Sequence, residues 1–257
     1  MKVSYVSDLH LDFWVRFDSN ILKWEKRTCE FITQLVNTDI GKREVLCIAG
    51  DLSHYNQQSL WALEVFATNY EHVFVQVGNH DYYLISGSQE RKYSNNSLNR
   101  VKELHEEIIK IKNVSSLFEG ELVVYKGFKF GGTPLWYPLE TFEQKVFFNS
   151  SSNDSVYIKG VNIQTEHNTN QLQYKTLLQQ NLDVMISHFP VINVGSHFNY
   201  NSTVCYLTPV EEINTKAWIF GHSHEQKVYE KPYCNFYMNA IGYPHEGMQL
   251  KIESFEI

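Results

Sequence analysis

Short apolar runs alternate with amphipathic stretches through the first half of the chain. The apolar runs are rich in β-branched and aromatic residues, which is typical of buried strands; they cover residues 3–7, 44–51 and 72–81. Between and after these runs, apolar residues recur at three- and four-residue spacing, which predicts helices over residues 24–36, 59–69 and 97–112. The order of strand and helix predicts a largely parallel sheet.

The second half of the chain follows a different pattern. Residues 122–137 predict a β-hairpin with Gly127 at its turn, and the Ser/Asn-rich residues 147–160 predict a loop. Further elements are expected in this order: a short helix over 171–181, a buried strand over 184–190, a flexible loop over 193–203, a strand over 217–224 and then β-hairpins. Neither an internal repeat nor a long linker is visible, so we expect one domain over residues 1–257.

Composition and charge exclude several classes of protein. The chain has 257 residues, of which 43% are hydrophobic and 20% charged, as in a globular protein. Its net charge of −7 provides no basic footprint for nucleic acid and no attraction to an anionic membrane.

Localisation can also be addressed from the sequence. Its 4 cysteines form no C-x-x-C pair, and Asp8 and Asp12 interrupt the apolar region that a signal peptide would need. No run approaches the ~18 apolar residues of a membrane helix. We therefore expect a cytoplasmic protein without a membrane segment.

Polar residues with ligand chemistry follow the strand-like runs. Asp8 and His10 come after the first run, at a spacing that places both side chains on one side of an extended chain. Comparable groups follow the other runs; the full set of candidate metal ligands is Asp8, His10, Asp51, Asn79, His188, His222 and His224. In open α/β sheets, ligands gather outside the carboxyl ends of the strands, so we expect these groups to converge.

The size and chemistry of this set indicate two metal ions. One four-coordinate ion cannot use every candidate, whereas two ions can if one carboxylate bridges them. Imidazole, carboxylate and amide ligands without a thiolate favour manganese, with iron or zinc as alternatives. Gly50, Gly78 and Gly221 stand just before ligands, where backbone must turn sharply and pack close to the metals.

The order of these motifs resembles the calcineurin-like metallophosphoesterase superfamily. The resemblance rests on Asp-x-His, Gly-Asp, Gly-Asn-His-Asp, a single His after a strand, and Gly-His-x-His, and it extends from Asp8 to His224. It implies an α/β fold, a four-layer α/β/β/α sandwich with two mixed β-sheets and a dinuclear metal site at the strand C-terminal ends. It further implies two sets of ligands that share Asp51: Asp8, His10, Asp51 and His224 for one metal, and Asp51, Asn79, His188 and His222 for the other.

The same resemblance assigns the catalytic roles. His80 matches the histidine that does not ligate metal and acts as general acid, and Asp81 matches its orienting carboxylate. Two divalent cations would lower the pKa of bound water toward ~7 and thus provide hydroxide as the nucleophile. His80 would then protonate the leaving group, while Asp81 would raise the pKa of His80 and hold its tautomer.

Other residues are candidates for substrate binding. His54 lies three positions after Asp51 and is a candidate for contact with the site, although a surface or helix-capping role is the alternative. Trp136 and Tyr137 are typical core aromatics, yet GGTPLWYP resembles a segment of a bacterial and phage branch of the superfamily, which suggests a wall of the pocket. Residues similar to others of that branch would line the cleft: Asn153, Asp154, Asn239, Gly242 and Tyr243.

Departures from related motifs narrow the substrate. Protein phosphatases of the superfamily carry Gly-Asp-x-Val-Asp-Arg-Gly, whereas this chain has GDLSHYN and thus lacks the arginine that grips a phosphomonoester. GNHD and GHSH are closer to the phosphodiesterase and nuclease branches. We therefore expect a small phosphodiester or nucleotide as substrate. The alternatives are a nuclease for single-stranded nucleic acid, a phosphomonoesterase for proteins or small molecules, and a non-catalytic metal-bound scaffold.

Overall fold

The computed structural model describes residues 1–194 and 207–257. Its strands are β1 (Lys2–Val6), β2 (Val45–Ala49), β3 (His72–Gln76), β4 (Val114–Ser116), β5 (Leu122–Tyr125), β6 (Phe128–Gly132), β7 (Leu182–Ile186), β8 (Thr215–Ile219), β9 (Gln226–Lys231), β10 (Cys234–Asn239) and β11 (Glu253–Glu256). Its α-helices are α1 (Leu11–Trp14), α2 (Ile21–Val36), α3 (Asn56–Asn69), α4 (Gly87–Lys92), α5 (Ser97–Ile108), α6 (Phe142–Ser151), α7 (Asn153–Tyr157) and α8 (Ile163–Leu178). Short 3₁₀ helices are η1 (Asn79–Tyr82) and η3 (Pro244–Glu246).

The strands form two mixed sheets. The first has the order β11-β1-β2-β3-β4 and the second the order β5-β6-β7-β8-β10-β9. In the first sheet only β11 runs antiparallel to its neighbour, and in the second only the edge strands β5 and β9 do so. The central strands of each sheet are thus parallel, as the sequence predicts, and the antiparallel strands β11, β5 and β9 lie only at edges.

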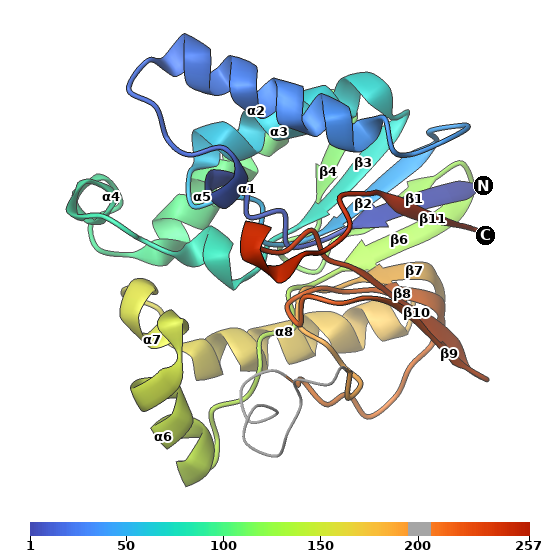
Figure 1. Cartoon of the computed structure of the whole chain (residues 1–257). Coiled ribbons are helices and arrows are strands. Elements are labelled where there is room, and N and C mark those ends of the chain that lie inside the picture. Colours follow the sequence, from blue (N-terminus) through green and yellow to red (C-terminus); the bar gives the residue numbers. More distant parts are fainter. Residues whose placement is uncertain (195–206) are drawn as a thin grey trace.

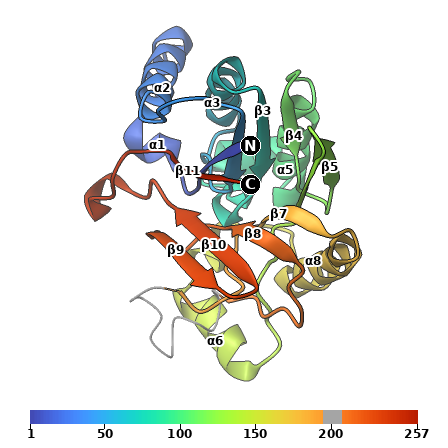
Figure 2. The same cartoon turned by 90° about the vertical axis from the view of Figure 1, so that its right-hand side faces the viewer.

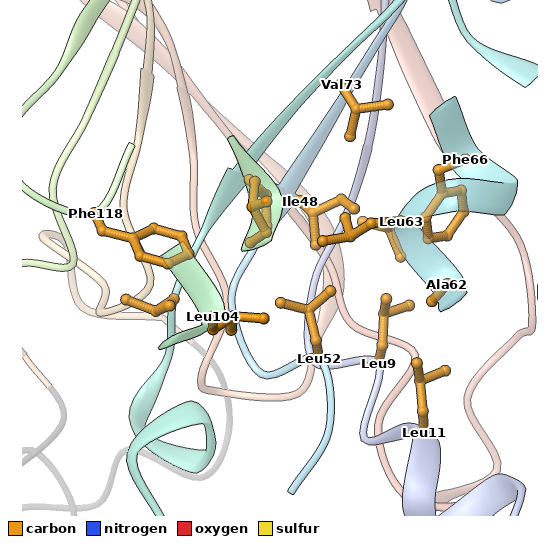
Figure 3. Packing of buried hydrophobic residues seen from close by; sticks show 14 of the residues in the cluster. Leu9, Leu11, Ile48, Leu52, Ala62, Leu63, Phe66, Val73, Leu104 and Phe118 are labelled. Atoms are coloured by element: carbon orange, nitrogen blue, oxygen red, sulfur yellow. The ribbon is translucent and has the colours of Figure 1, made fainter. Parts of the chain in front are cut away.

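Helices cover the outer face of each sheet, as Figures 1 and 2 show. Alternation along β2 explains the layers: Leu46 and Ile48 face α2, α3 and α5, while Val45 and Cys47 face the second sheet. Figure 3 shows part of the packing between the first sheet and its helices, where Ile48 and Val73 meet Leu63 and Phe66. On the second sheet, Met185 and Trp218 pack with residues of α8. These layers confirm the expected α/β/β/α sandwich.

Two expectations about the middle of the chain were wrong. The Ser/Asn-rich residues 147–160 do not form a loop but contribute to α6 and α7. The side chain of Thr141 caps α6 together with Gln144, and Ser152 caps α7, so polar residues begin these helices and do not break them. Helix α8 begins at Ile163, before the expected 171, because Asn162 provides its N-cap. The loop expected over 193–203 lies, from residue 195 on, outside the described residues.

The connections that follow the parallel strands gather at one end of the two sheets. The chain termini lie side by side at the opposite end (Figure 1), where the N-terminal amino group donates a hydrogen bond to the carbonyl of Ile257. A parallel bridge between Ser7 and Ala240 joins the two sheets where β1 and β10 end. Within the described residues, no helix has the length and apolar character needed to cross a membrane.

Candidate dinuclear metal centre

The seven candidate ligands converge, although they come from both sheets. Those after β1, β2 and β3 belong to the first sheet, and those after β7 and β8 belong to the second. The groups Asp8–His10–His224 and Asp8–Asp51–His188 each place one ligand atom per residue within 4.8 Å of the others. The structure therefore brings together residues that are far apart in the sequence.

The first half of the centre contains Asp8, His10, Asp51 and His224. The Nε2 atoms of His10 and His224 are 3.0 Å apart. His10 Nε2 is 3.7 Å from Asp51 Oδ2, and His224 Nε2 is 3.5 Å from Asp8 Oδ1. Two imidazole nitrogens and two carboxylates thus face one point.

The second half of the centre shares Asp51. His188 Nε2 is 3.5 Å from Asp51 Oδ2 and 3.0 Å from Asn79 Oδ1. His222 Nδ1 is 3.2 Å from the same Asn79 oxygen. Asp51 Oδ2 therefore lies between His10 of the first half and His188 of the second, which is the position a bridging carboxylate needs.

The backbone at the candidate ligands is strained. Asp8, His10 and Asp51 have positive φ angles of 51°, 40° and 57°, and those of His222 and His224 are 70° and 45°. Non-glycine residues adopt this left-handed conformation rarely and at a free-energy cost, and such residues cluster at functional sites. The expectation that Asp8 and His10 lie in an extended chain was therefore wrong, since β1 ends at Val6 before them.

Two glycines make the close approach of the strands possible. A Cβ atom on Gly50 would overlap Nδ1 of His188, and one on Gly78 would overlap Oδ1 of Asp51. Gly50 also has a φ of +89°, which side chains rarely adopt. The absence of a side chain at these positions thus lets the second sheet's His188 reach the carboxylate of the first sheet.

The electrostatics of the centre suit cations. Burial, with the neighbouring carboxylates of Asp8 and Asp81, raises the pKa of Asp51 well above its usual range. Burial also lowers the pKa of His10 and of His222 well below that of free histidine, so both rings are neutral and able to ligate metal. Buried carboxylates that repel one another, next to neutral imidazoles, form a set of donors that suits divalent cations.

Several ligands are oriented by neighbours on their far side. His188 Nδ1 is 2.8 Å from the carbonyl of Ala49, and His224 Nδ1 is 2.8 Å from Glu246. Asn79 donates from Nδ2 to Asp154 at 2.8 Å, which directs its Oδ1 toward the histidines. Such partners fix the tautomer and orientation of metal ligands.

His80 lies beside the centre, with its ring held by His54. The Nδ1 atom of His80 is 2.8 Å from His54 Nε2, and His54 Nδ1 is 2.8 Å from Asp12 Oδ2. His80 Nε2 is 3.3 Å from the hydroxyl of Tyr243. His54 is thus placed against the candidate general acid.

The structure differs from the expectation that Asp81 orients the His80 ring and raises its pKa. Burial and the neighbouring histidines instead lower the pKa of His80. The carboxylate of Asp81 accepts hydrogen bonds from the backbone N–H groups of Asp51, Leu52 and Gly78 at 2.8–3.2 Å. Asp81 therefore ties together the backbones that carry Asp51 and Asn79, while the expected contact with the His80 ring is made by His54.

A buried arginine holds the connections that follow β2 and β3. Arg100 on α5 donates to the carbonyls of His80 and Tyr83 at 2.8 and 2.9 Å, and to that of Ser53 at 2.5 Å. Its Nε donates to Asn56 Oδ1 at 3.1 Å. No sequence signal marks Arg100, because it is a single charged residue on an amphipathic helix.

For Trp136 and Tyr137 the structure agrees with the core alternative and not with a wall of the pocket. Their exposed fractions are 0% and 1%, and neither residue lines the cavity at the centre. Trp136 packs against Tyr82 and Phe189, and the hydroxyl of Tyr137 donates to Asp154. Both belong to the core behind the site, and Tyr137 and Asn79 donate hydrogen bonds to the same carboxylate, that of Asp154.

A cavity of about 350 Å³ opens over the centre. Asp51, Asn79, His80, His222 and His224 line its floor. Its walls come from the junction of α6 and α7 and from the segment before β11, through Ser151, Ser152, Asn153, Asp154, Tyr243 and Glu246. Asn153, Asp154 and Tyr243 thus line the cleft as expected, while Asn239 is buried below it and bonds the carbonyl of Tyr5.

Comparison with known proteins agrees with this geometry. A family model described as calcineurin-like phosphoesterase matches residues 1–226. The chain belongs to the calcineurin-like phosphoesterase family. This phosphoesterase is accordingly a hydrolase of phosphoesters, and its family uses divalent metals. A search of curated protein sequences found no match.

Solved structures share the fold of this phosphoesterase. Phosphopantetheinyl hydrolase (PptH) from Mycobacterium tuberculosis has 17% sequence identity and a TM-score of 0.70, over 95% of this chain and 90% of that chain. The protein TT1561 of Thermus thermophilus has 9% identity and a TM-score of 0.55, over 99% and 98% of the two chains. At these identities the likeness concerns the fold alone.

Two residues at the site were not predicted from the sequence as site residues. Glu246 holds His224, and Asp12 holds His54. Asp12 continues the alternation of Asp8 and His10, which is a weak signal. Glu246 follows the last family motif, where only the folded chain brings it to His224.

Proposed function

We propose that this phosphoesterase hydrolyses a small phosphodiester or a nucleotide. The observation that carries the proposal is the charge of the cavity over the metal centre. Its lining includes the carboxylates of Asp51, Asp154 and Glu246, and among the described residues no lysine or arginine lines it. A phosphomonoester dianion has one more negative charge than a diester and finds no side-chain cation here. A diester monoanion is therefore the better fit.

The residues would hold two divalent cations in the two halves described above. Asp8, His10 and His224 would serve one ion, Asn79, His188 and His222 the other, and Asp51 would bridge them. The nitrogen- and oxygen-only donor set supports manganese, with iron or zinc as alternatives. When bound, the cations would neutralise phosphoryl oxygens and acidify water for attack at phosphorus.

The protein's own contribution to bond cleavage centres on His80. Its Nε2 is 3.3 Å from the hydroxyl of Tyr243, which also lines the cavity, and its Nδ1 is fixed by His54. His80 would donate a proton from Nε2 to the leaving oxygen as the bond between phosphorus and oxygen breaks. Asp12 keeps the His54 ring in place, and Asp81 keeps the backbones of both metal-ligand segments together.

The two sheets that carry the candidate ligands pack against each other. The two sheets share an apolar core, in which Phe74 of the first stacks on Phe130 of the second. We therefore infer one domain over residues 1–257, with the ligands at the seam between its sheets.

The test compares two esters with the same leaving group. Metal-free protein is reconstituted with Mn²⁺ and assayed on a nitrophenyl phosphodiester and on nitrophenyl phosphate. We expect turnover of the nitrophenyl diester that requires metal. In a second assay on an alkyl diester, whose leaving group is poor, turnover should fall by about 10²–10⁴-fold in His80→Ala. His105→Ala, in which the lost ring contacts Ser116 away from the site, serves as the matched control. Cleavage of the monoester alone would refute the proposal.

A further inference from the structure

A second cavity adjoins the first and shares the candidate general acid with it. It has a volume of about 470 Å³, within the range of small-molecule sites. The two cavities have His80, Tyr83, Asn153 and Tyr243 in common. None of the seven candidate ligands lines the second cavity, so it extends from His80 away from the metals.

The second cavity is aromatic and carries little charge. Phe13, Tyr83, Tyr157 and Tyr243 line it, together with Ile85. Its one carboxylate, Asp12, is engaged by the backbone N–H and the ring of His54. Among the described residues no lysine or arginine lines it. This chemistry suits a neutral, flat group and disfavours a further phosphate.

The cavity contains an exposed ring, that of Phe13, and rings that stack on their neighbours. Phe13 is 43% exposed although it is a large apolar residue, and it meets Tyr243 edge to face at 4.7 Å. Tyr243 and His245 lie parallel, with ring centroids 5.6 Å apart and an interplanar angle of 5°. Aromatic surfaces of this kind bind nucleobases by stacking.

The position of His80 determines which part of a diester lies here. A general acid must be within hydrogen-bond distance of the oxygen that it protonates. The leaving group therefore lies on the His80 side of the phosphorus, and the other ester group stays over the first cavity. We propose that the second cavity binds the leaving group of the substrate, and that this group is a nucleoside with an uncharged base. This inference rests on the proposed phosphodiester hydrolysis and gives it an orientation.

The reaction that tests the proposal uses a diester with two different ends. The methyl phosphate diester of the 5′-hydroxyl of adenosine can lose either end. In the expected reaction water bonds to phosphorus, the P–O5′ bond breaks and O5′ receives a proton. The products are adenosine and methyl phosphate. Formation of adenosine 5′-phosphate and methanol would overturn the proposal.

A second ester isolates the contribution of the base. The corresponding diester of methyl riboside has the same reacting bond and no base. We expect kcat/KM to be about tenfold higher for the adenosine ester, because stacking of the base on aromatic side chains is lost without it. Phe13→Ala should remove most of this preference, and Phe13→Tyr should keep it. Phe142→Ala is the matched control, since this ring is 77% exposed and lines neither cavity.

A binding measurement separates this proposal from the proposed function. Equilibrium dialysis of adenosine against metal-free protein should detect binding that Phe13→Ala weakens and Phe142→Ala does not. Absence of adenosine binding in a protein that hydrolyses a nitrophenyl diester would overturn the second cavity as a nucleoside site while leaving the diesterase proposal intact. Adenosine binding that depends on Phe13, in a protein without diesterase activity, would support the site and refute the proposed reaction.

Discussion

At the residue scale, His54 contacts the ring of His80, a contact that its position in the sequence did not predict. The family resemblance assigned the orienting role to Asp81, the residue that follows His80. The side chain of Asp81 instead turns to backbone N–H groups, and the ring of His54 meets His80. Contact between side chains at the end of a strand depends on where each connection turns, which local spacing does not encode.

Asp12→Asn tests whether this chain of contacts acts on His80. We expect kcat to fall roughly tenfold or more on a diester with a poor leaving group. The loss should not exceed the ~10²–10⁴-fold that a general acid supplies. The loss should be smaller for a nitrophenyl ester, which needs little proton donation, and KM should change little.

The double variant provides the control for Asp12→Asn. In the His80→Ala background Asp12→Asn should cause no further loss, because its effect passes through His80. An equal loss with and without His80, or an equal loss for both leaving groups, would show a general structural effect and contradict the prediction.

Glu246 supports a metal ligand at the same scale. Burial alone would lower the pKa of His224, but its hydrogen bond to Glu246 and the charge of Asp8 outweigh burial and raise that pKa. Glu246→Gln keeps the shape and removes the charge, so we expect metal affinity to fall about 10–100-fold. Competition with a chromophoric chelator measures the affinity. Unchanged affinity would mean that Glu246 does not orient His224 for metal.

At the scale of elements, local signals predicted most of the strands and the four longest helices, α2, α3, α5 and α8, but not the shorter helices α1, α4, α6 and α7. Apolar runs marked β1, β2 and β3 correctly, because buried parallel strands are apolar on both faces. The Ser/Asn-rich stretch that became α6 and α7 was read as a loop, since the same residues favour both turns and helix N-caps. Which of the two they form depends on the residues that follow and on packing.

Arg100 shows how one helix stabilises the connections around the site. Its guanidinium on α5 joins the connection after β2 to that after β3, through the carbonyls of Ser53, His80 and Tyr83. Burial lowers the pKa of Arg100, and the charges of nearby groups, Asp81 first, act in the opposite direction.

Arg100→Met should therefore destabilise the protein. It removes the positive charge near the buried Asp81 and leaves the carbonyls of Ser53, His80 and Tyr83 without this donor, which costs about 3–5 kcal/mol in the free energy of unfolding. Urea unfolding in excess chelator measures this without a contribution from metal. Arg100→Lys should recover only part of the loss, because one ammonium cannot reach all four acceptors. A loss below about 1 kcal/mol for Arg100→Met would contradict this role.

At the scale of the whole molecule, the candidate centre joins the two sheets. Asp8, Asp51 and Asn79 follow strands of one sheet, and His188 and His222 follow strands of the other. Cations bound between them would hold the sheets together and would be absent from the unfolded chain. Metal binding should therefore be coupled to folding.

Metal removal should lower the unfolding temperature. A ligand that binds only the folded state at about 100 times its Kd adds about 2.7 kcal/mol per site to the free energy of unfolding. Calorimetry with Mn²⁺ and with chelator measures the difference. His188→Ala should lose much of the metal-dependent increase, whereas His105→Ala should keep it. The same unfolding temperature with metal and with chelator would argue against a centre that bridges the sheets.

The sequence by itself determined the family, the alternation of strands and helices, and the identity of the candidate ligands. These features are local: apolar runs form strands, and each ligand follows a strand within a few residues. Tertiary structure alone decided that Asp51 lies between His10 and His188, that His54 meets His80, and that Trp136 is buried. It also placed an aromatic cavity beside His80, built from α1, α7 and the segment before β11. These contacts join residues far apart in the chain, and their geometry depends on how the two sheets and their connections pack.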